Sequence, residues 1–313
     1  MNDKHTIEKF FGGYVEIEEN SGYLCLYRFS SAQRAFYNNQ GGFFGSRSRF
    51  QSGVYAHIKD CEKITFDFKV FTNSMEGIFF EIVNENGNRE QICFTESKAR
   101  FEVEFSKETV WIYFPYYAEV GIRNIEIVGD EVAKPLKKIY CFGDSITQGY
   151  FSQHQAISYP QVLGRELGAE TFNFGIGGYY FDNRVLRDLD SLEKPYAVTI
   201  SFGTNDWHFE MEYVDEMKET FNKVYEKYKN IPIFVILPAA RVTEKQVKKT
   251  GTLDDVRKLI RTEAERYENF TVIDSVCNLD CETMLTEDGV HPNDKGTEFL
   301  AECVLEKIRS VLL

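Results

Sequence analysis

Residues 137–149 read KKIYCFGDSITQG, and this stretch decides how the second half of the chain is interpreted. Four apolar residues at 139–142 end at a glycine, which predicts a short buried strand followed by a polar loop. The same pattern returns downstream. Apolar runs at 139–142, 171–174, 197–202, 233–237 and 270–273 alternate with helical spacing at 159–167, 181–189, 214–228, 253–267 and 295–311. This alternation predicts an α/β domain over residues 139–313, with a parallel sheet between two layers of helices.

In the residues before this stretch, apolar side chains recur with a different period. Residues 63–71 (KITFDFKVF) and 101–105 (FEVEF) alternate apolar and polar side chains, and 77–83, 110–114 and 121–128 are further short strand-like runs. No segment shows a clear helical repeat, and residues 30–52, with Phe36, Tyr37, Phe43 and Phe44, are expected to form a long loop. About eight short strands predict an all-β, jelly-roll-like sandwich over residues 1–130. A polar segment with Pro135, residues 131–138, is the predicted linker.

The amino-acid composition argues against some classes of binding partner. There are 36 Lys and Arg against 49 Asp and Glu, a net charge of −13, which argues against a nucleic-acid partner. Aromatic residues make up 15 % of the chain, which favours sheet-rich packing over a stacking surface. No apolar run is long enough to span a bilayer, so no membrane partner is expected. The sequence leaves a homo-oligomer open.

Seven cysteines cannot all pair within one chain, and the pair Cys277 and Cys281 has no second pair or adjacent histidine to complete a zinc site. Reduced, buried thiols are the better interpretation. The first ten residues carry charges where a signal peptide needs an apolar core. We therefore expect a cytoplasmic protein with no metal ion.

Polar residues follow four of the predicted strands, at the edge of a parallel sheet where ligands bind. They include all that acyl transfer requires: a nucleophile, a base, a group that orients the base, and donors for the oxyanion. Ser145 follows the first strand, and His291 has Asp288 three residues earlier in the loop before the last helix. Gly178 offers a backbone N–H and Asn205 a side-chain amide.

Nucleotide-binding motifs fit these loops poorly. Gly149 is followed by Tyr150 where a P-loop needs lysine, and Tyr180 stands where a third dinucleotide-binding glycine belongs. The nucleophile elbow also fails, because Thr147 stands in place of its second glycine.

Over residues 137–313 the chain resembles the GDSL, or SGNH, hydrolases. The resemblance rests on four blocks in order, around Ser145, Asn173 and Gly178, Asn205, and Asp288 with His291. It implies a three-layer, flavodoxin-like αβα domain, no cofactor, and a triad of Ser145, His291 and Asp288. It also implies an oxyanion hole from the Ser145 N–H, Gly178 and Asn205. A β-sandwich before such a domain resembles certain carbohydrate esterases, including acetylxylan esterases, which implies a short-chain, O-acetyl carbohydrate ester as substrate.

One departure concerns the second block, where Gly177 and Tyr179 flank Gly178 in place of the Ser and Asp of many members. This change leaves the backbone donor but alters the expected acyl pocket. Candidate pocket residues are Tyr179, Trp207, His208 and His154. A lipase-like or thioesterase acylhydrolase is the alternative enzyme, and a carbohydrate-binding protein with an inactive hydrolase domain is the alternative outside enzymes.

Overall fold

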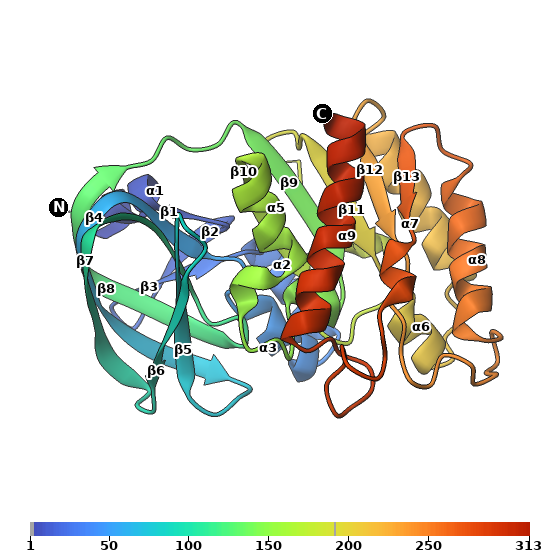
Figure 1. Ribbon diagram of the computed structural model, residues 1–313, viewed down its shortest axis with the longest axis horizontal. Coiled ribbons are helices and arrows are strands. Elements are labelled where there is room, and N and C mark those ends of the chain that lie inside the picture. Colours follow the sequence, from blue (N-terminus) through green and yellow to red (C-terminus); the bar gives the residue numbers. More distant parts are fainter. Residues whose placement is uncertain (1–2, 191) are drawn as a thin grey trace. The chain divides into compact units, whose positions relative to one another are not determined.

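The computed structural model describes residues 3–190 and 192–313. The chain divides into two compact units, Met1–Leu136 and Lys137–Leu313, and the division falls inside the segment 131–138. Each unit has its own sheet (Figure 1).

The second unit is built on a five-stranded parallel sheet. Its strands are β9 (Lys137–Gly143), β10 (Ala169–Gly175), β11 (Ala197–Ser201), β12 (Ile233–Ile236) and β13 (Phe270–Ile273). Their order is β10-β9-β11-β12-β13, the flavodoxin-like order. The chain therefore runs outward from β9 to β10 and then returns to the other side of β9. In sheets of this order, ligands bind beyond the carboxyl ends of the strands at such a reversal, which here lies between β9 and β11.

Helices cover both faces of this sheet. They are α4 (Ser145–Gln148), α5 (Tyr159–Leu167), α6 (Thr204–His208), α7 (Val214–Lys227), α8 (Leu253–Ala264) and α9 (Asp294–Leu312), with 3₁₀ turns at Gln155–Ile157, Asn183–Leu186 and Ser275–Asn278. Helices α5 and α9 pack on one face, where Leu163 and Val304 share a core with Ile139 of β9. Strands β11, β12 and β13 are added in the opposite direction along the sheet from β10. Right-handed connections between them therefore place α7 and α8 on the other face.

The five expected strands are confirmed, and each is within a few residues of its predicted bounds. One expected helix is wrong, because residues 181–189 form only the 3₁₀ turn Asn183–Leu186. The Asp182 side chain accepts from the backbone N–H of Arg184 (2.9 Å) and also binds its guanidinium, which favours a capped turn over a continuing helix.

The first unit contains an eight-stranded antiparallel sheet. Its strands are β1 (Phe11–Gly12), β2 (Glu16–Asn20), β3 (Tyr23–Tyr27), β4 (Tyr55–Asn73), β5 (Ile78–Asn84), β6 (Arg89–Phe94), β7 (Lys98–Tyr113) and β8 (Ala118–Glu131). Their order is β2-β3-β8-β4-β7-β5-β6, with β1 paired to β4. All eight strands are joined through hydrogen bonds into one sheet, so the expected jelly roll is not confirmed. The runs 101–105 and 110–114, predicted as two strands, lie in the single strand β7 apart from Phe114.

Aromatic packing fills the core of this unit. The rings of Phe66 and Phe101 stack with centroids 4.7 Å apart, and Phe80 contacts both edge-on. All three side chains are fully buried. Part of the aromatic excess thus lies in sheet packing, as the composition predicts.

Three helices in this unit were not expected: α1 (Asp3–Phe10), α2 (Ser31–Asn39) and α3 (Gly42–Arg49). Helices α2 and α3 occupy most of the predicted loop 30–52, and Phe36 and Tyr37 are buried. Only Phe43 is strongly exposed among the four aromatics of that segment. The prediction of an all-β unit with a long loop is therefore wrong.

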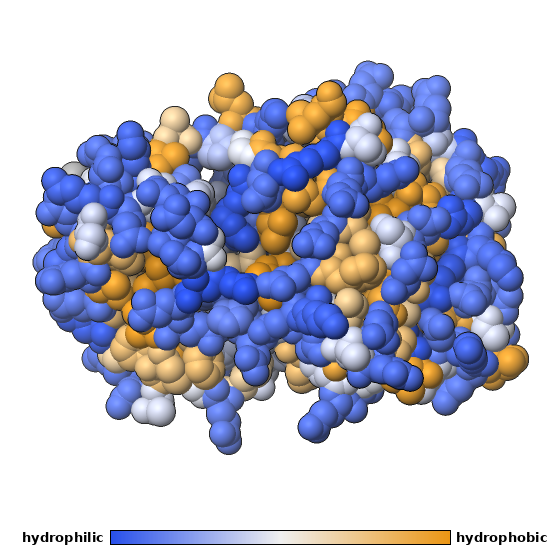
Figure 2. Space-filling model, in the orientation of Figure 1, coloured by the Kyte–Doolittle hydropathy of each residue, from blue (hydrophilic) through white to orange (hydrophobic). Residues whose placement is uncertain are grey.

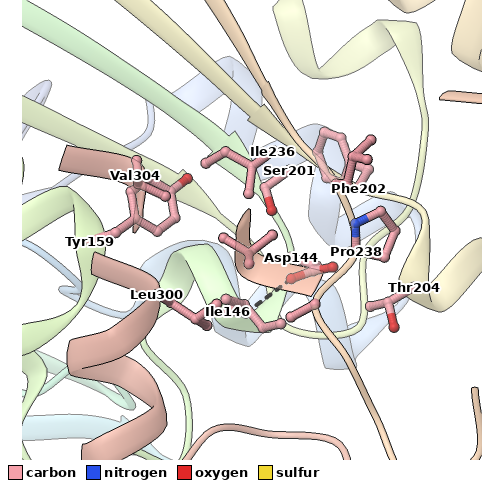
Figure 3. A pocket seen from close by; sticks show the side chains of 13 residues that line it. Asp144, Ile146, Tyr159, Ser201, Phe202, Thr204, Ile236, Pro238, Leu300 and Val304 are labelled. Atoms are coloured by element: carbon pink, nitrogen blue, oxygen red, sulfur yellow. Dashed lines mark hydrogen bonds between the residues drawn. The ribbon is translucent and has the colours of Figure 1, made fainter. Parts of the chain in front are cut away.

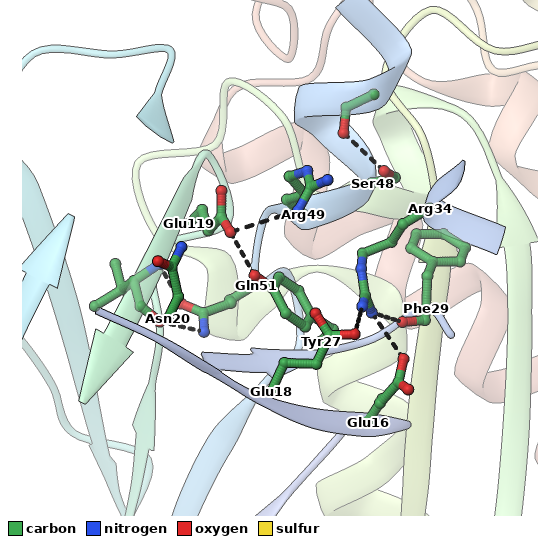
Figure 4. Close-up of polar contacts among 12 residues, drawn as sticks. Glu16, Glu18, Asn20, Tyr27, Phe29, Arg34, Ser48, Arg49, Gln51 and Glu119 are labelled. Atoms are coloured by element: carbon green, nitrogen blue, oxygen red, sulfur yellow. Dashed lines mark hydrogen bonds and ion pairs between the residues drawn. The ribbon is translucent and has the colours of Figure 1, made fainter. Parts of the chain in front are cut away.

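Buried polar contacts attach α2 to the sheet (Figure 4). The Arg34 guanidinium binds the carboxylates of Glu16 (3.1 Å) and Glu18 (2.5 Å) on β2, and donates to the Phe29 carbonyl. Its side chain is only 3 % exposed, so these charge-assisted bonds hold the helix in one position. A short helix with little apolar periodicity is therefore stabilised by partners distant in the sequence.

The described part of the chain holds no helix long and apolar enough to cross a membrane. Hydrophilic side chains cover most of the face seen in Figure 2, with hydrophobic ones in separate patches. All seven cysteines are free; Cys25, Cys61 and Cys141 are buried as expected, whereas Cys93 is exposed and the other three are partly buried.

Candidate active site

Ser145 lies at the tight turn between β9 and the short helix α4. The Asp144 carboxylate accepts from the backbone N–H of Ile146 (2.9 Å) and so caps this helix. Gly143 has no room for a side chain, since a Cβ there would lie 1.9 Å from the Thr147 hydroxyl oxygen. Close packing around the turn therefore holds Ser145 at the end of the strand.

His291 and Asp288 contact Ser145 in series. The Oγ of Ser145 lies 2.8 Å from Nε2 of His291, and Nδ1 of the same ring lies 2.6 Å from Oδ2 of Asp288. The other carboxylate oxygen, Oδ1, accepts from the backbone N–H groups of Val290 and His291 and from the Thr286 hydroxyl. These bonds leave the Asp288 side chain little freedom to turn away from the imidazole.

The same contacts determine the charge of Asp288. Partial burial raises the pKa of this carboxyl, but bonds from the His291 backbone and ring, the Val290 N–H and the Thr286 hydroxyl outweigh it. The net result is a pKa well below the usual value for aspartate. Asp288 is therefore an anion throughout the neutral range and can stabilise a positive charge on His291.

Backbone and amide donors lie on the neighbouring loops. Within the described chain no acceptor takes the backbone N–H of Ser145 or of Gly178. Gly178 has φ +80°, a conformation that glycine adopts without strain. The Asn205 amide donates one N–H to the Tyr179 carbonyl (2.8 Å), which leaves its second N–H for a ligand.

Contacts between loops hold the segments that carry these donors close to the turn that carries Ser145. Asn173 donates to the Thr147 carbonyl (2.8 Å), and the Gly177 N–H donates to the Gln148 side chain (2.7 Å). A Cβ on Gly175 would lie 2.4 Å from the Gln148 backbone nitrogen. Helix α4 and the loop after β10 are thus in close backbone contact. The hydrogen bond from Asn205 to the Tyr179 carbonyl also attaches the loop after β11 to the loop after β10.

Two buried carboxyl groups, those of Asp144 and Asp206, accept hydrogen bonds from the backbone near these loops. Asp144 borders a cavity of about 10 Å³, enough for about one water molecule, beside apolar side chains such as Ile146 and Pro238 (Figure 3). Burial raises the pKa of Asp144 to about 7, against the opposing bond from Ile146. Asp206 accepts from the backbone N–H of Phe181 (3.0 Å), and burial raises its pKa to about 7 as well.

The predicted pocket residues are placed differently from one another. Tyr179 and Trp207 are buried, with the Tyr179 hydroxyl bonded to Asp182 and the Trp207 indole N–H bonded to the Gly251 carbonyl. His208 is exposed, and its Nδ1 lies 3.4 Å from the Arg241 guanidinium. His154 is half-buried.

Phe151 was not singled out from the sequence, yet its ring lies on the imidazole of His291, with centroids 4.6 Å apart. Buried Arg241, on the loop after β12, was also missed. Burial lowers the pKa of its guanidinium, which still donates to Thr204 beside Asn205. Position after a strand is a signal that could have found Arg241, but no sequence signal marks Phe151.

A family model, GDSL-like Lipase/Acylhydrolase family, matches residues 141–299. No curated protein sequence matches the chain.

Solved structures share the fold at low sequence identity. A salicylyl-acyltransferase, SsfX3, from a tetracycline biosynthetic pathway has a TM-score of 0.77 at 16 % identity, over 96 % of this chain and 94 % of that one. A candidate GDSL-like lipase from Bacteroides ovatus has a TM-score of 0.74 at 18 % identity, over 97 % and 96 %. A family two carbohydrate esterase from Clostridium thermocellum, in complex with cellohexaose, has a TM-score of 0.64 at 16 % identity, over 84 % and 94 %.

The family model spans about half of the chain and includes Ser145, Asn205 and His291. The chain therefore belongs to the GDSL-like lipase/acylhydrolase family.

Proposed function

We propose that this protein is a serine esterase that removes short acyl groups, chiefly acetyl, from the hydroxyls of a carbohydrate. One observation carries the proposal: Ser145 Oγ lies 2.8 Å from His291 Nε2, and His291 Nδ1 lies 2.6 Å from Asp288. A serine hydroxyl is a weak nucleophile at neutral pH unless a base takes its proton as it attacks.

In the acylation step, Ser145 Oγ attacks the ester carbonyl while His291 Nε2 takes the hydroxyl proton. The carbonyl oxygen gains negative charge and is stabilised by the N–H groups of Ser145 and Gly178 and by the free N–H of Asn205. When the tetrahedral intermediate collapses, the bond to the alcohol oxygen breaks and His291 gives that oxygen its proton.

Water then completes the reaction. His291 takes a proton from a water molecule, which attacks the acyl-serine, and the acid leaves as Ser145 recovers its proton. The Asp288 anion holds the imidazole with Nε2 toward the serine and stabilises the imidazolium formed in each step.

A carbohydrate substrate is supported by the arrangement of the whole chain. The family two carbohydrate esterase from Clostridium thermocellum shares the fold over 84 % of this chain, a span that extends beyond the hydrolase unit. The chain's net charge of −13 favours a neutral ester over an anionic one.

Two alternatives make different predictions. A lipase-like or thioesterase acylhydrolase would retain or gain activity as the acyl chain lengthens, whereas an acetylesterase loses it beyond about four carbons. A carbohydrate-binding protein with an inactive hydrolase domain would bind sugar without turnover. The short contacts between Ser145, His291 and Asp288 favour an enzyme over the second alternative.

Acetate release from acetylated xylo-oligosaccharides and from a simple acetyl ester tests the proposal. We expect wild type to release acetate from both and Ser145→Ala to lose at least three orders of magnitude in kcat/KM. Ser310→Ala, which removes an exposed serine of α9, should match wild type. Unchanged hydrolysis by Ser145→Ala would contradict the mechanism, and faster cleavage of long-chain esters would contradict the substrate.

A further inference from the structure

A feature not used in the mechanism above is the segment that follows α4. Phe151 has φ +66°, a left-handed conformation that bulky side chains rarely adopt. Its side chain is 45 % exposed, although the ring lies against His291. An exposed aromatic ring in an unfavourable backbone conformation beside a catalytic base points to a functional constraint.

Neighbouring contacts explain how the strained conformation is maintained. The Ser152 hydroxyl (3.0 Å) and the Gln153 backbone N–H (2.8 Å) both donate to Oδ1 of Asp294, the first residue of α9. Asp294 is three residues after His291, so the start of α9, just beyond the loop that carries the base, also holds the segment that carries Phe151. The Tyr150 ring packs edge-on against Phe151, with centroids 4.9 Å apart, and so restrains the Phe151 ring as well.

The proton transfer from His291 indicates which part of the substrate lies next to the Phe151 ring. His291 Nε2 donates its proton to the departing alcohol oxygen, so that oxygen must lie within hydrogen-bond reach of Nε2. Carbon atoms of the alcohol then lie next to the imidazole, on the side of the bond away from the acyl group. The centroid of the Phe151 ring lies 4.6 Å from that of the imidazole, with the two ring planes inclined by 42°, so the ring is close enough to contact these carbon atoms.

We propose that Phe151 binds the alcohol part of the substrate, by packing on the apolar C–H face of a pyranose ring. The inference rests on the proposed esterase function and adds a residue that selects the leaving group. It assigns no role to Phe151 in acyl-length selection, because the acyl group lies on the opposite side of the scissile bond. Asp294 is then a positioning residue that acts through Ser152 and Gln153.

The test compares two acetyl esters that differ only in the alcohol: an acetylated methyl xyloside and ethyl acetate. We expect Phe151→Ala to lower kcat/KM for the xyloside by about tenfold, mainly through KM, and for ethyl acetate by less than about threefold. Phe151→Tyr should restore the wild-type ratio because it keeps the aromatic face. Phe209→Ala is the matched control and should leave the ratio unchanged, since Phe209 is also an exposed aromatic residue of this unit but follows α6, and its ring contacts His208.

Asp294→Ala, which removes the acceptor for Ser152 and Gln153, should change the ratio in the same direction as Phe151→Ala. Asp294→Asn keeps an acceptor oxygen and should have a smaller effect. Thermal unfolding of each variant checks that the fold is retained.

Equal losses on both esters would show that Phe151 only supports His291, and no loss on either would show that it is not at the alcohol site. Either result overturns the inference while the esterase function stands. If wild type releases no acetate, or if Ser145→Ala is as active as wild type, the proposed function itself fails.

Discussion

Replacement of Asp206 by asparagine should make the second unit less sensitive to pH. Asp206 is fully buried; its Oδ1 accepts from the Phe181 N–H, and its Oδ2 has no partner among the described residues. Asparagine keeps the acceptor and removes the ionisable group. The substitution therefore isolates the free energy of burying a charge.

The magnitude follows from the pKa of this carboxyl, which burial raises from 3.8 to about 7. An unfolded chain ionises the group near pH 4, whereas the folded chain keeps the proton until about pH 7. Raising the pH between these values therefore favours the unfolded state, and the difference reaches about 4 kcal/mol near pH 7 and above. Between pH 5.5 and 7.0 the group removes about 1.5 kcal/mol of stability.

Urea unfolding at the two pH values measures this loss. Trp111→Phe as the common background leaves Trp207, next to Asp206, as the one tryptophan reporting on the second unit. We expect the free energy of unfolding of Asp206→Asn, relative to the background, to rise by about 1.5 kcal/mol from pH 5.5 to 7.0. The exposed Asp215→Asn is the control. A relative stability that is the same at both pH values would refute the assignment of a neutral, buried Asp206.

Three further predictions concern the loops. Asn205→Ala removes the proposed oxyanion donor and the bond to Tyr179 (2.8 Å), and should lower kcat by about 10²–10³ for an acetyl ester. Asp288→Asn replaces the anion beside His291 and should lower kcat by about 10⁴, with little change in KM; a loss below tenfold would argue against its role. Gly175→Ala brings a Cβ to 2.4 Å from the Gln148 backbone and should lower the free energy of unfolding by about 1–3 kcal/mol, whereas Gly42→Ala, which meets nothing within 4 Å, should not.

The parallel sheet was predictable because its strands are buried on both faces and appear as short, continuous apolar runs between helical patterns. Helix α2 was not predicted, because its stability comes from distant partners such as Glu16 and Glu18 on β2. One local signal was present: Ser30 and Gln33 form a capping box at the start of α2. The glycine pair at 41–42 separates the two helices and made the segment look like a loop.

The candidate site residues could be predicted from the sequence, because acyl transfer requires particular residue types and these follow predicted strands. They are Ser145, His291, Asp288, Gly178 and Asn205. Phe151 could not be found in this way. Its importance depends on a positive φ and on contacts of Ser152 and Gln153 with Asp294, 141 residues or more along the chain. Local sequence does not encode such a conformation, because the strain is maintained by tertiary contacts.

The two buried carboxyls show how the site and its stability are connected. Asp144 caps α4 through Ile146, and Asp206 binds the backbone N–H of Phe181, just beyond the loop of Gly178. Both groups reduce stability at neutral pH, because burial raises the pKa of each to about 7. Asparagine can make the same bond at either position without that loss. The carboxyls therefore have no advantage for folding above pH 7. Both lie close to the loops around Ser145, and we expect Asp144→Asn and Asp206→Asn to lower kcat by changing the electrostatic environment of that serine. An unchanged kcat in both variants would show that the two carboxyls do not act on Ser145.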